Sequence, residues 1–247
     1  MRFTIVIILA FLIGAAVLAE TSRAERRLLR ADPDALAADP ALLRFAVRRG
    51  QPLFMIHCAA CHGVSGAGDP VKGVPDLTDG DWLYGSGRVA DIEHIIEYGI
   101  RSRHPKTWSL AIMPAYGRPH PSPGDSNIQP LAPGQISDLI EFLFRQQGRK
   151  ADAAAASRGA VLYGGDAGCY DCHAHDAKGD AAIGAPNLTD AVTLYGDGSR
   201  EALFLSIAQG RQGMCPAWIM TMSAAGIRET AVYVYSISHR VEVPNAD

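Results

Sequence analysis

The chain has 247 residues, enough for one or two globular domains, and 48% of them are hydrophobic while 20% are charged. These proportions are ordinary for a folded globular protein. The formal net charge of −3 argues against a nucleic-acid partner. No segment resembles a hydrolytic triad, a phosphate-binding loop or a dinucleotide site, because the glycine-rich segments lack the strand and helix that phosphate and dinucleotide sites require.

The N-terminal part of the chain is a nearly unbroken apolar run over residues 3–19, preceded by Arg2. A basic start, an apolar centre and small residues before Glu20 fit a secretory signal peptide. The run is also at the lower length limit for a membrane-spanning helix. Both interpretations of residues 1–20 stay open, and we favour the uncleaved anchor. Residues 21–38 are charged and alanine-rich, which predicts a tether outside the core.

A helix is expected to begin at Pro40 and to lead into Cys58. Asp39 is a favourable N-cap residue, and proline suits the first position of a helix. Apolar residues follow with helical spacing, although Gly50 and Pro52 are expected to interrupt the helix. The residues that follow Cys58 would then lie at the end of this helix.

A C-x-x-C-H motif occurs twice, as Cys58-Ala59-Ala60-Cys61-His62 and as Cys169-Tyr170-Asp171-Cys172-His173. This motif is the attachment site of a c-type haem, in which two thiols bind the haem vinyl groups and the histidine ligates the iron. One motif could arise by chance or form half of a zinc site, but two with matching flanks point to haem. The sequence therefore predicts two covalently bound haem c groups, with His62 and His173 as proximal ligands.

The cysteine count indicates the compartment. Of 5 cysteines, four belong to the two motifs, so that Cys215 is left alone and no internal disulfide can form once both haems are attached. Covalent haem attachment suits an oxidising compartment. We expect the haem region on the periplasmic side of the inner membrane, anchored by the N-terminal helix, or soluble in the periplasm if residues 1–20 are removed.

Each motif is followed by a glycine-rich loop that ends in Gly-x-Pro-x-Leu-Thr-Asp. The interval from Cys58 to Pro75 equals that from Cys169 to Pro186, so the repeat carries no net insertion there. A ligand histidine usually donates its second ring N–H to a fixed acceptor. The carbonyl oxygens of Pro75 and Pro186 are predicted to be these acceptors.

The repeat defines the domain organisation. We expect the first haem domain over residues 39–148, a linker over 149–157 that contains four consecutive alanines, the second haem domain over 158–240, and a tail over 241–247. Within the domains, apolar periodicity predicts further helices around residues 92–96, 135–145, 203–207 and 224–238, whereas the prolines between 119 and 133 exclude a helix.

Met113 is the predicted sixth ligand of the first haem, because it follows the middle helix and precedes Pro114, which would fix its backbone. A thioether ligand raises the haem potential. Less favoured alternatives are three histidines, His94, His104 and His120. Arg101 and Arg211 follow equivalent glycines and are candidates to pair with haem propionates.

The sixth ligand of the second haem is left open by the sequence. When the two repeats are aligned on Pro114 and Pro216, Cys215 occupies the ligand position. It could ligate the iron as a thiolate, or Met214 could do so after a shift of one residue. Alternatively neither ligates, and Cys215 is a small buried hydrophobic residue. Met220 and Met222 are further candidates.

Four segments together resemble a known family: residues 54–68, 75–85, 113–115 and 184–190, the second of which contains Pro-Asp-Leu-Thr-Asp and Trp-Leu-Tyr-Gly. They are similar to the di-haem cytochrome c subunit of cbb-type haem–copper oxidases over about residues 40–240. The resemblance implies an all-α fold of two tandem class-I cytochrome c domains behind an N-terminal hydrophobic helix. It also implies partners, a donor cytochrome and the oxidase core subunit. The chain departs from the family where Cys215 replaces a methionine.

Electron transfer without substrate chemistry is the function that we favour, and it assigns no catalytic residue. Three alternatives remain. The chain could be a stand-alone electron acceptor of a periplasmic dehydrogenase, a di-haem oxidoreductase of small sulfur compounds with a Cys-ligated haem, or a haem sensor. The sixth ligand of the second haem discriminates among them, because a catalytic or sensing haem needs an exchangeable or unusual ligand.

Overall fold

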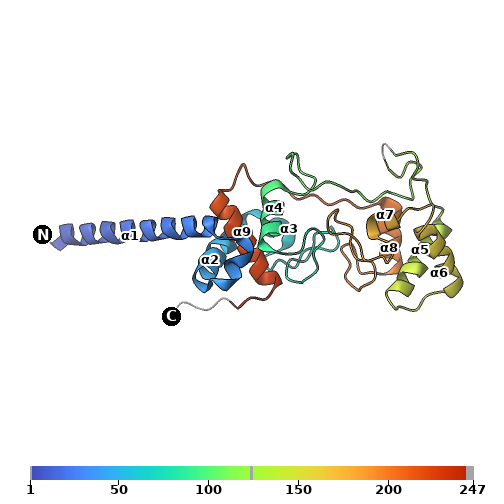
Figure 1. Cartoon of the computed structure of the whole chain (residues 1–247), viewed down its shortest axis with the longest axis horizontal. Coiled ribbons are helices and arrows are strands. Elements are labelled where there is room, and N and C mark those ends of the chain that lie inside the picture. Colours follow the sequence, from blue (N-terminus) through green and yellow to red (C-terminus); the bar gives the residue numbers. More distant parts are fainter. Residues whose placement is uncertain (1, 123–124, 243–247) are drawn as a thin grey trace.

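The computed structural model describes residues 2–122 and 125–242, and Figure 1 shows their arrangement. Within these ranges all regular secondary structure is helical, apart from a few isolated β-bridges. The prediction of an all-α fold is therefore confirmed. The predicted tail over 241–247 lies outside the described residues except for its first two positions.

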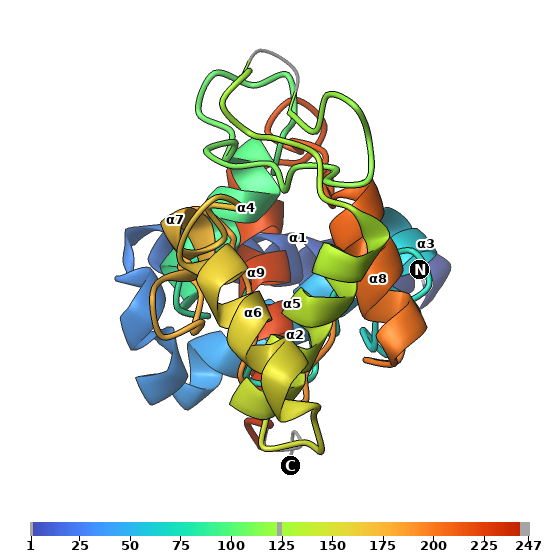
Figure 2. The same ribbon diagram turned by 90° about the vertical axis from the view of Figure 1, so that its right-hand side faces the viewer.

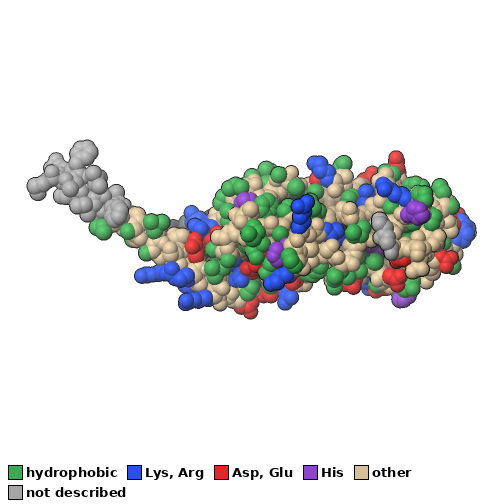
Figure 3. Space-filling model, turned by 90° about the horizontal axis from the view of Figure 1, so that it is seen from above, with side chains coloured by type: hydrophobic (Ala, Val, Ile, Leu, Met, Phe, Trp, Pro, Cys, Tyr) green, Lys and Arg blue, Asp and Glu red, His purple; other side chains and the backbone are tan. Residues whose placement is uncertain are grey.

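The first helix, α1 (Arg2–Arg30), projects away from the rest of the molecule, as Figures 1 and 3 show. A short 3₁₀-helix, η1 (Pro33–Ala38), follows it. None of the described helices is both long enough and apolar enough to cross a membrane. The prediction that residues 21–38 form a tether outside the core is wrong, since Leu28 and Leu36 are 0% and 1% exposed within a hydrophobic cluster.

Eight further helices form the body of the described chain: α2 (Pro40–His57), α3 (Ala59–His62), α4 (Val89–Tyr98), α5 (Pro133–Gln146), α6 (Ala153–Tyr163), α7 (Tyr170–His173), α8 (Arg200–Gln209) and α9 (Ala224–Ser238). Two of them, α3 and α7, are single turns that contain the C-x-x-C-H motifs. Long irregular segments surround these turns and connect the helices.

Helix α2 begins as predicted. The Asp39 side chain accepts hydrogen bonds from the backbone N–H groups of Ala41 and Leu42, both at 3.1 Å. The expected interruption does not occur, because α2 continues through Gly50 and Pro52 to the residue before the first motif. A Cβ at Gly50 would lie 2.1 Å from the carbonyl oxygen of Glu229. Glycine therefore allows α2 to cross α9 at close range.

The predicted linker over 149–157 is partly wrong, because its four alanines form the start of α6. The Asp152 side chain caps this helix by accepting a hydrogen bond of 2.7 Å from the N–H of Ala155. Alanine has the highest helix propensity of the common residues, so a capped run of alanines forms a helix more readily than an open linker.

Buried apolar side chains form two separate clusters. The first lies among α2, α4 and α9, with Leu28 and Leu36 added. The second lies among α5, α6 and α8. We refer to the helices around the first cluster, with α3, as the first unit, and to those around the second cluster, with α7, as the second unit.

The two units do not follow the predicted boundary between residues 148 and 158. Helix α9, the last of the second repeat, packs on α2 and α4, whereas α5, the last of the first repeat, packs on α6 and α8. Figure 1 shows α9 beside α2 near one end of the body and α5 beside α6 at the other, and Figure 2 shows α5, α6 and α8 from the side of the second unit. The final helices of the repeats are thus exchanged.

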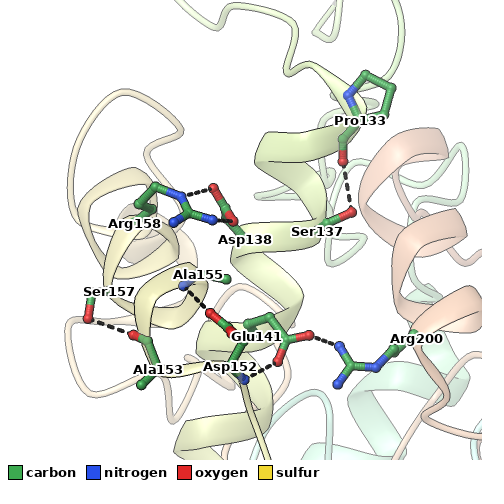
Figure 4. Close-up of polar contacts among 10 residues, drawn as sticks. All are labelled: Pro133, Ser137, Asp138, Glu141, Asp152, Ala153, Ala155, Ser157, Arg158 and Arg200. Carbon is green, nitrogen blue, oxygen red and sulfur yellow. Dashed lines mark hydrogen bonds and ion pairs between the residues drawn. The ribbon is translucent and has the colours of Figure 1, made fainter.

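Gly159 on α6 has the same part in the second unit that Gly50 on α2 has in the first. A Cβ at Gly159 in α6 would lie 2.0 Å from the carbonyl oxygen of Asp138 in α5. Near this crossing Arg158 donates two hydrogen bonds to the Asp138 carboxylate, at 2.8 and 2.6 Å, and Glu141 pairs with Arg200 of α8 (Figure 4). Each repeat therefore uses a glycine on its first helix to approach the last helix of the other repeat.

Candidate haem-binding sites

Both motif histidines make the hydrogen bond that the sequence suggested. The Nδ1 atom of His62 lies 3.1 Å from the carbonyl oxygen of Pro75, and Nδ1 of His173 lies 3.0 Å from that of Pro186. A carbonyl oxygen can only accept, so Nδ1 carries the proton in both rings. The Nε2 lone pair of each imidazole is then free to bind a metal.

The surroundings of His62 and His173 keep both imidazoles neutral. Burial lowers the pKa of each side chain below its usual value, while the hydrogen bond to the proline carbonyl acts in the opposite direction. A neutral imidazole is the form that ligates iron. Burial and orientation thus prepare the two rings for the same role.

The first cysteine of each motif, Cys58 or Cys169, is partly buried, whereas Cys61 is exposed. Burial raises the pKa of the Cys58 thiol to about 12, and nearby Cys215 and Cys61 add to the shift. Burial likewise raises the pKa of Cys169 to about 12. These thiols are therefore protonated at neutral pH in the protein without a bound group.

Met113 lies beside the second unit. It packs against the cluster of the second unit, and its N–H donates to the carbonyl oxygen of Arg211 at 3.1 Å. Tyr116, three residues later, donates its hydroxyl hydrogen to the carbonyl oxygen of Ala167, two residues before the second motif. The segment after α4 therefore crosses to the second unit, and the assignment of Met113 to the first haem remains a prediction.

Cys215 lies beside the first unit, because the segment after α8 crosses to it. Its backbone exchanges two hydrogen bonds of 2.9 Å with that of Ile100, which follows α4 of the first unit. Trp218 packs edge-on against His57, just before the first motif, with ring centroids 4.8 Å apart. Met214 is 75% exposed, whereas Cys215 is partly buried.

The two arginines proposed to pair with propionates have protein partners. Arg101 donates to the carbonyl oxygens of Ala111 and Gly213, and its guanidinium lies 5.7 Å from the centroid of the Tyr84 ring. Arg211 donates twice to Ser206 Oγ, at 3.1 and 3.0 Å, and lies over the Tyr195 ring. These contacts hold both side chains in place, and pairing with propionates remains a prediction.

Two buried polar side chains near the motifs were not identified as site residues from the sequence. The Trp82 indole N–H and the Tyr84 hydroxyl are buried and have no hydrogen-bond partner among the described residues. Buried tryptophan and tyrosine usually have such a partner, because an unpaired buried donor is costly. Both are donors, so a bound group with acceptor oxygens near them, such as a haem propionate, would satisfy them. The residues present therefore fit a haem c.

Comparisons with known proteins show what the whole chain is similar to. A family model described as cytochrome c matches residues 47–146. The chain is 37% identical to the cbb3-type cytochrome c oxidase subunit CcoP of Rhodobacter capsulatus, over 90% of this chain and 73% of that protein. It is 35% identical to CcoP of Cereibacter sphaeroides, over 86% of this chain and 68% of the relative. It is 38% identical to the subunit FixP of Bradyrhizobium sp. ORS 278, over 81% and 63% respectively.

Proposed function

The chain belongs to the family of cbb3-type oxidase cytochrome c subunits that includes CcoP and FixP, and on that premise we propose that it is a di-haem electron relay. One haem c would be held at Cys58, Cys61 and His62. The other would be held at the equivalent residues of the second motif, Cys169, Cys172 and His173. The observation that carries the proposal is the duplicated motif, in which each histidine donates to an equivalent proline carbonyl at almost the same distance.

Each residue has a defined part in this function. A haem c supplies reversible exchange of one electron at its iron. The two thioethers fix its position, and the motif histidine ligates the iron from one face. The carbonyl oxygens of Pro75 and Pro186 hold the histidine rings in a single tautomer and orientation. No residue has to transfer a proton or attack a substrate, which is consistent with a relay that lacks a reaction of its own.

Contacts between the two units support electron passage between the sites. The N–H of Gly85 donates to the carbonyl oxygen of Ala181 at 3.1 Å, and the N–H of Gly196 donates to that of Pro70 at 2.9 Å. All four residues lie in the loops that follow the C-x-x-C-H motifs. The loops around the two sites therefore touch. We propose that electrons enter from a donor cytochrome and leave to the core subunit of the oxidase.

We also propose that the N-terminal segment keeps the protein at the periplasmic face of the membrane. The apolar run over residues 3–19 supports this location, and Leu12, Ile13 and Leu18 on α1 are exposed to solvent. Alkaline extraction of membranes tests it. The full chain should stay in the membrane pellet, whereas a chain without residues 2–19, exported by a cleavable signal, should be released. Release of both would contradict the proposal.

The haem content of the purified protein tests the central proposal. A pyridine haemochrome assay with intact mass should give two haems per chain, and changing both motif cysteines of one repeat to alanine should give one. An oxidase preparation without this subunit should lose oxygen consumption driven by a reduced cytochrome c and regain it when the subunit is restored. A single haem in the unaltered chain would overturn the di-haem proposal, and no loss of oxygen consumption would overturn the relay.

A further inference from the structure

Each C-x-x-C-H motif is followed by a short closed loop that ends at the proline beside the motif histidine. We call residues 69–75 the first proline loop and residues 180–186 the second proline loop. In both loops the first and sixth residues exchange two backbone hydrogen bonds of 2.9–3.0 Å. The last residue, Pro75 or Pro186, supplies the carbonyl oxygen that holds the histidine ring. A displacement of the closed loop would therefore move that oxygen.

The chain that leaves each motif lies directly against the proline carbonyl. A Cβ at Gly68 would lie 2.6 Å from the carbonyl oxygen of Pro75, and a Cβ at Gly179 would lie 2.5 Å from that of Pro186. The N–H of each glycine also donates to the carbonyl oxygen of the motif histidine, at 2.9 and 3.0 Å. One side of each proline loop is thus closely packed on its own motif, and the position of its tip depends on other contacts.

A tyrosine of the other repeat covers the tip of each proline loop. Tyr84 is 4% exposed, and a Cβ at Gly184 would lie 2.1 Å from its ring. Tyr195 lies against Gly73 in the same way, at 2.0 Å. The interval between the two tyrosines equals that between the two glycines, so the contact is reciprocal. Both glycines have positive φ, at +74° and +69°, where a side chain would be strained as well as crowded.

Backbone hydrogen bonds fix both tyrosines beside these tips. The N–H of the glycine that follows each tyrosine donates to the carbonyl oxygen of the second residue of the loop, at 3.1 Å to Ala181 and at 2.9 Å to Pro70. Figure 1 shows the irregular segments after α3 and after α7 meeting between the two units. Each proline loop therefore touches the motif histidine of its own repeat on one side and the tyrosine of the other repeat on the other side.

The second proline loop has one further contact with the first repeat. Trp108 Nε1 donates to the carbonyl oxygen of Ala182 at 2.7 Å, and the Trp108 and Tyr84 ring centroids are 5.7 Å apart. The equivalent position in the second repeat is Ile219, whose side chain cannot donate a hydrogen bond. Two aromatic side chains of the first repeat thus hold the second proline loop.

We propose that the two tyrosines are positioning residues that act across the repeats, so that Tyr84, with Trp108, sets the hydrogen bond of His173, and Tyr195 sets that of His62. This inference rests on the proposed di-haem function. The hydrogen bond from Nδ1 makes the imidazole a more basic ligand. A more basic ligand favours ferric iron, so a weaker hydrogen bond should raise the haem potential. Each tyrosine therefore affects the haem that is attached to the other repeat.

The aromatic ring carries the contact in both cases. Ring carbon atoms of Tyr84 and Tyr195 lie nearest to the two glycines. The Tyr84 hydroxyl is buried and has no hydrogen-bond partner among the described residues, so it is free to donate to a bound group. Phenylalanine keeps the ring and removes the hydroxyl, whereas alanine removes both. Comparison of the alanine variant with the phenylalanine variant therefore isolates the packing on the loop.

Redox titration of the full two-haem chain tests the proposal. The chain with Cys169→Ala and Cys172→Ala retains the first haem only and identifies the potential that belongs to it. Relative to Tyr84→Phe, Tyr84→Ala should raise the potential of the second haem and leave that of the first unchanged. Relative to Tyr195→Phe, Tyr195→Ala should raise the potential of the first haem and leave that of the second unchanged.

Three further variants keep both tyrosines and give an independent measurement if an alanine variant fails to fold. Trp108→Phe removes the hydrogen bond to the second proline loop and should raise the potential of the second haem only. Gly184→Ala would push the same loop away from Tyr84 and should also raise that potential. Gly80→Ala is the matched control, because no atom lies within 4 Å of its Cβ. It should change neither potential.

Three results would overturn the proposal. A response of the first haem alone to Tyr84→Ala would show that this tyrosine acts within its own repeat. Equal shifts from Tyr84→Phe and Tyr84→Ala would assign the effect to the hydroxyl. Potentials that respond to neither tyrosine would show that the proline loops keep their position without the other repeat. Fewer than two haems in the unaltered chain would instead contradict the proposed function, so that the two failures can be distinguished.

Discussion

The first and second units contain the same parts in different chain order. The second unit runs continuously from Met113 to Arg211, so that Met113 and α5 precede its C-x-x-C-H motif. The first unit is interrupted, because α9 comes from the far end of the described chain. Nevertheless both place the histidine on the proline carbonyl at 3.1 and 3.0 Å. Local sequence thus determines the hydrogen bond of each motif histidine, whereas the origin of the last helix differs between the units.

The two helix crossings differ in their ion pairs. In the first unit Glu229 is 1% exposed and pairs with Arg49, which also contacts Glu25 at 2.8 Å. In the second unit Arg158 is largely exposed and pairs with Asp138, whose side chain is 16% exposed, compared with 2% for that of Glu229. A buried carboxylate costs more to ionise than a surface one. The stability of the first unit therefore depends more on buried contacts, and substitutions in it should lower the free energy of unfolding more than those in the second unit.

The largest effect is expected from Phe54→Ala. Phe54 is 0% exposed, and its ring centroid lies 5.3 Å from that of Tyr233 on α9. Removal of a buried phenylalanine side chain costs about 3–5 kcal/mol. Chemical denaturation followed by circular dichroism should show this loss in the free energy of unfolding. Tyr233→Phe, which keeps the ring, is the control and should have a small effect. A loss below about 1 kcal/mol for Phe54→Ala would contradict the packing of α2 on α9.

Alanine at the crossing glycines should give the next largest effect. Gly50→Ala and Gly159→Ala each place a Cβ against a carbonyl oxygen of the partner helix. Overpacking of this kind costs about 1–3 kcal/mol. Gly134→Ala on α5 is the matched control, because no atom lies within 4 Å of its Cβ. It should leave the melting temperature unchanged or raise it slightly. Equal responses of all three variants would argue against close crossings.

The N-caps of the first helices of the two repeats should be equivalent. Asp39 caps α2 and Asp152 caps α6 through their carboxylates. Substitution of either by alanine should cost about 1 kcal/mol of unfolding free energy, whereas asparagine should retain most of the cap. Thermal unfolding of the four variants measures this. If Asp152→Ala had no effect, residues 153–157 would be a linker after all.

The contributions of Glu229, paired with Arg49, and of Asp138, paired with Arg158, to the stability of the fold should change with pH in opposite directions. Burial raises the pKa of Glu229 above 4.5, so the folded protein binds this proton more tightly and ionisation of Glu229 opposes folding as pH rises. Arg158 lowers the pKa of Asp138 below 3.8, so this pair contributes stability above that pH and loses it as pH falls. We expect these two pH-dependent changes in stability to be smaller than the effects of the substitutions described above.

Comparison with neutral amides separates the two contributions between pH 3 and pH 7. The stability of Glu229→Gln relative to the unaltered chain should increase with pH. The stability of Asp138→Asn relative to the unaltered chain should decrease with pH up to about 4 and then stay constant. Parallel pH dependences of the two variants would contradict the difference in burial between the crossings.

The sequence by itself determined the features that depend on neighbours along the chain. Short intervals between residues account for the two C-x-x-C-H motifs and for the capped start of α2. They also account for the hydrogen bonds from the motif histidines to Pro75 and Pro186. The all-α fold follows from apolar periodicity within single helices. These features need no knowledge of how distant helices pack.

Only the tertiary structure decided which repeat supplies the last helix of each unit. Helices α5 and α9 both carry many buried apolar residues, and apolar periodicity does not say which unit buries them. The choice depends on contacts between residues far apart in sequence, such as Gly50 with α9 and Gly159 with α5. Burial of Leu28 and Leu36 depends on similar distant contacts. For the same reason Met113 lies beside the second unit and Cys215 pairs with Ile100 of the first.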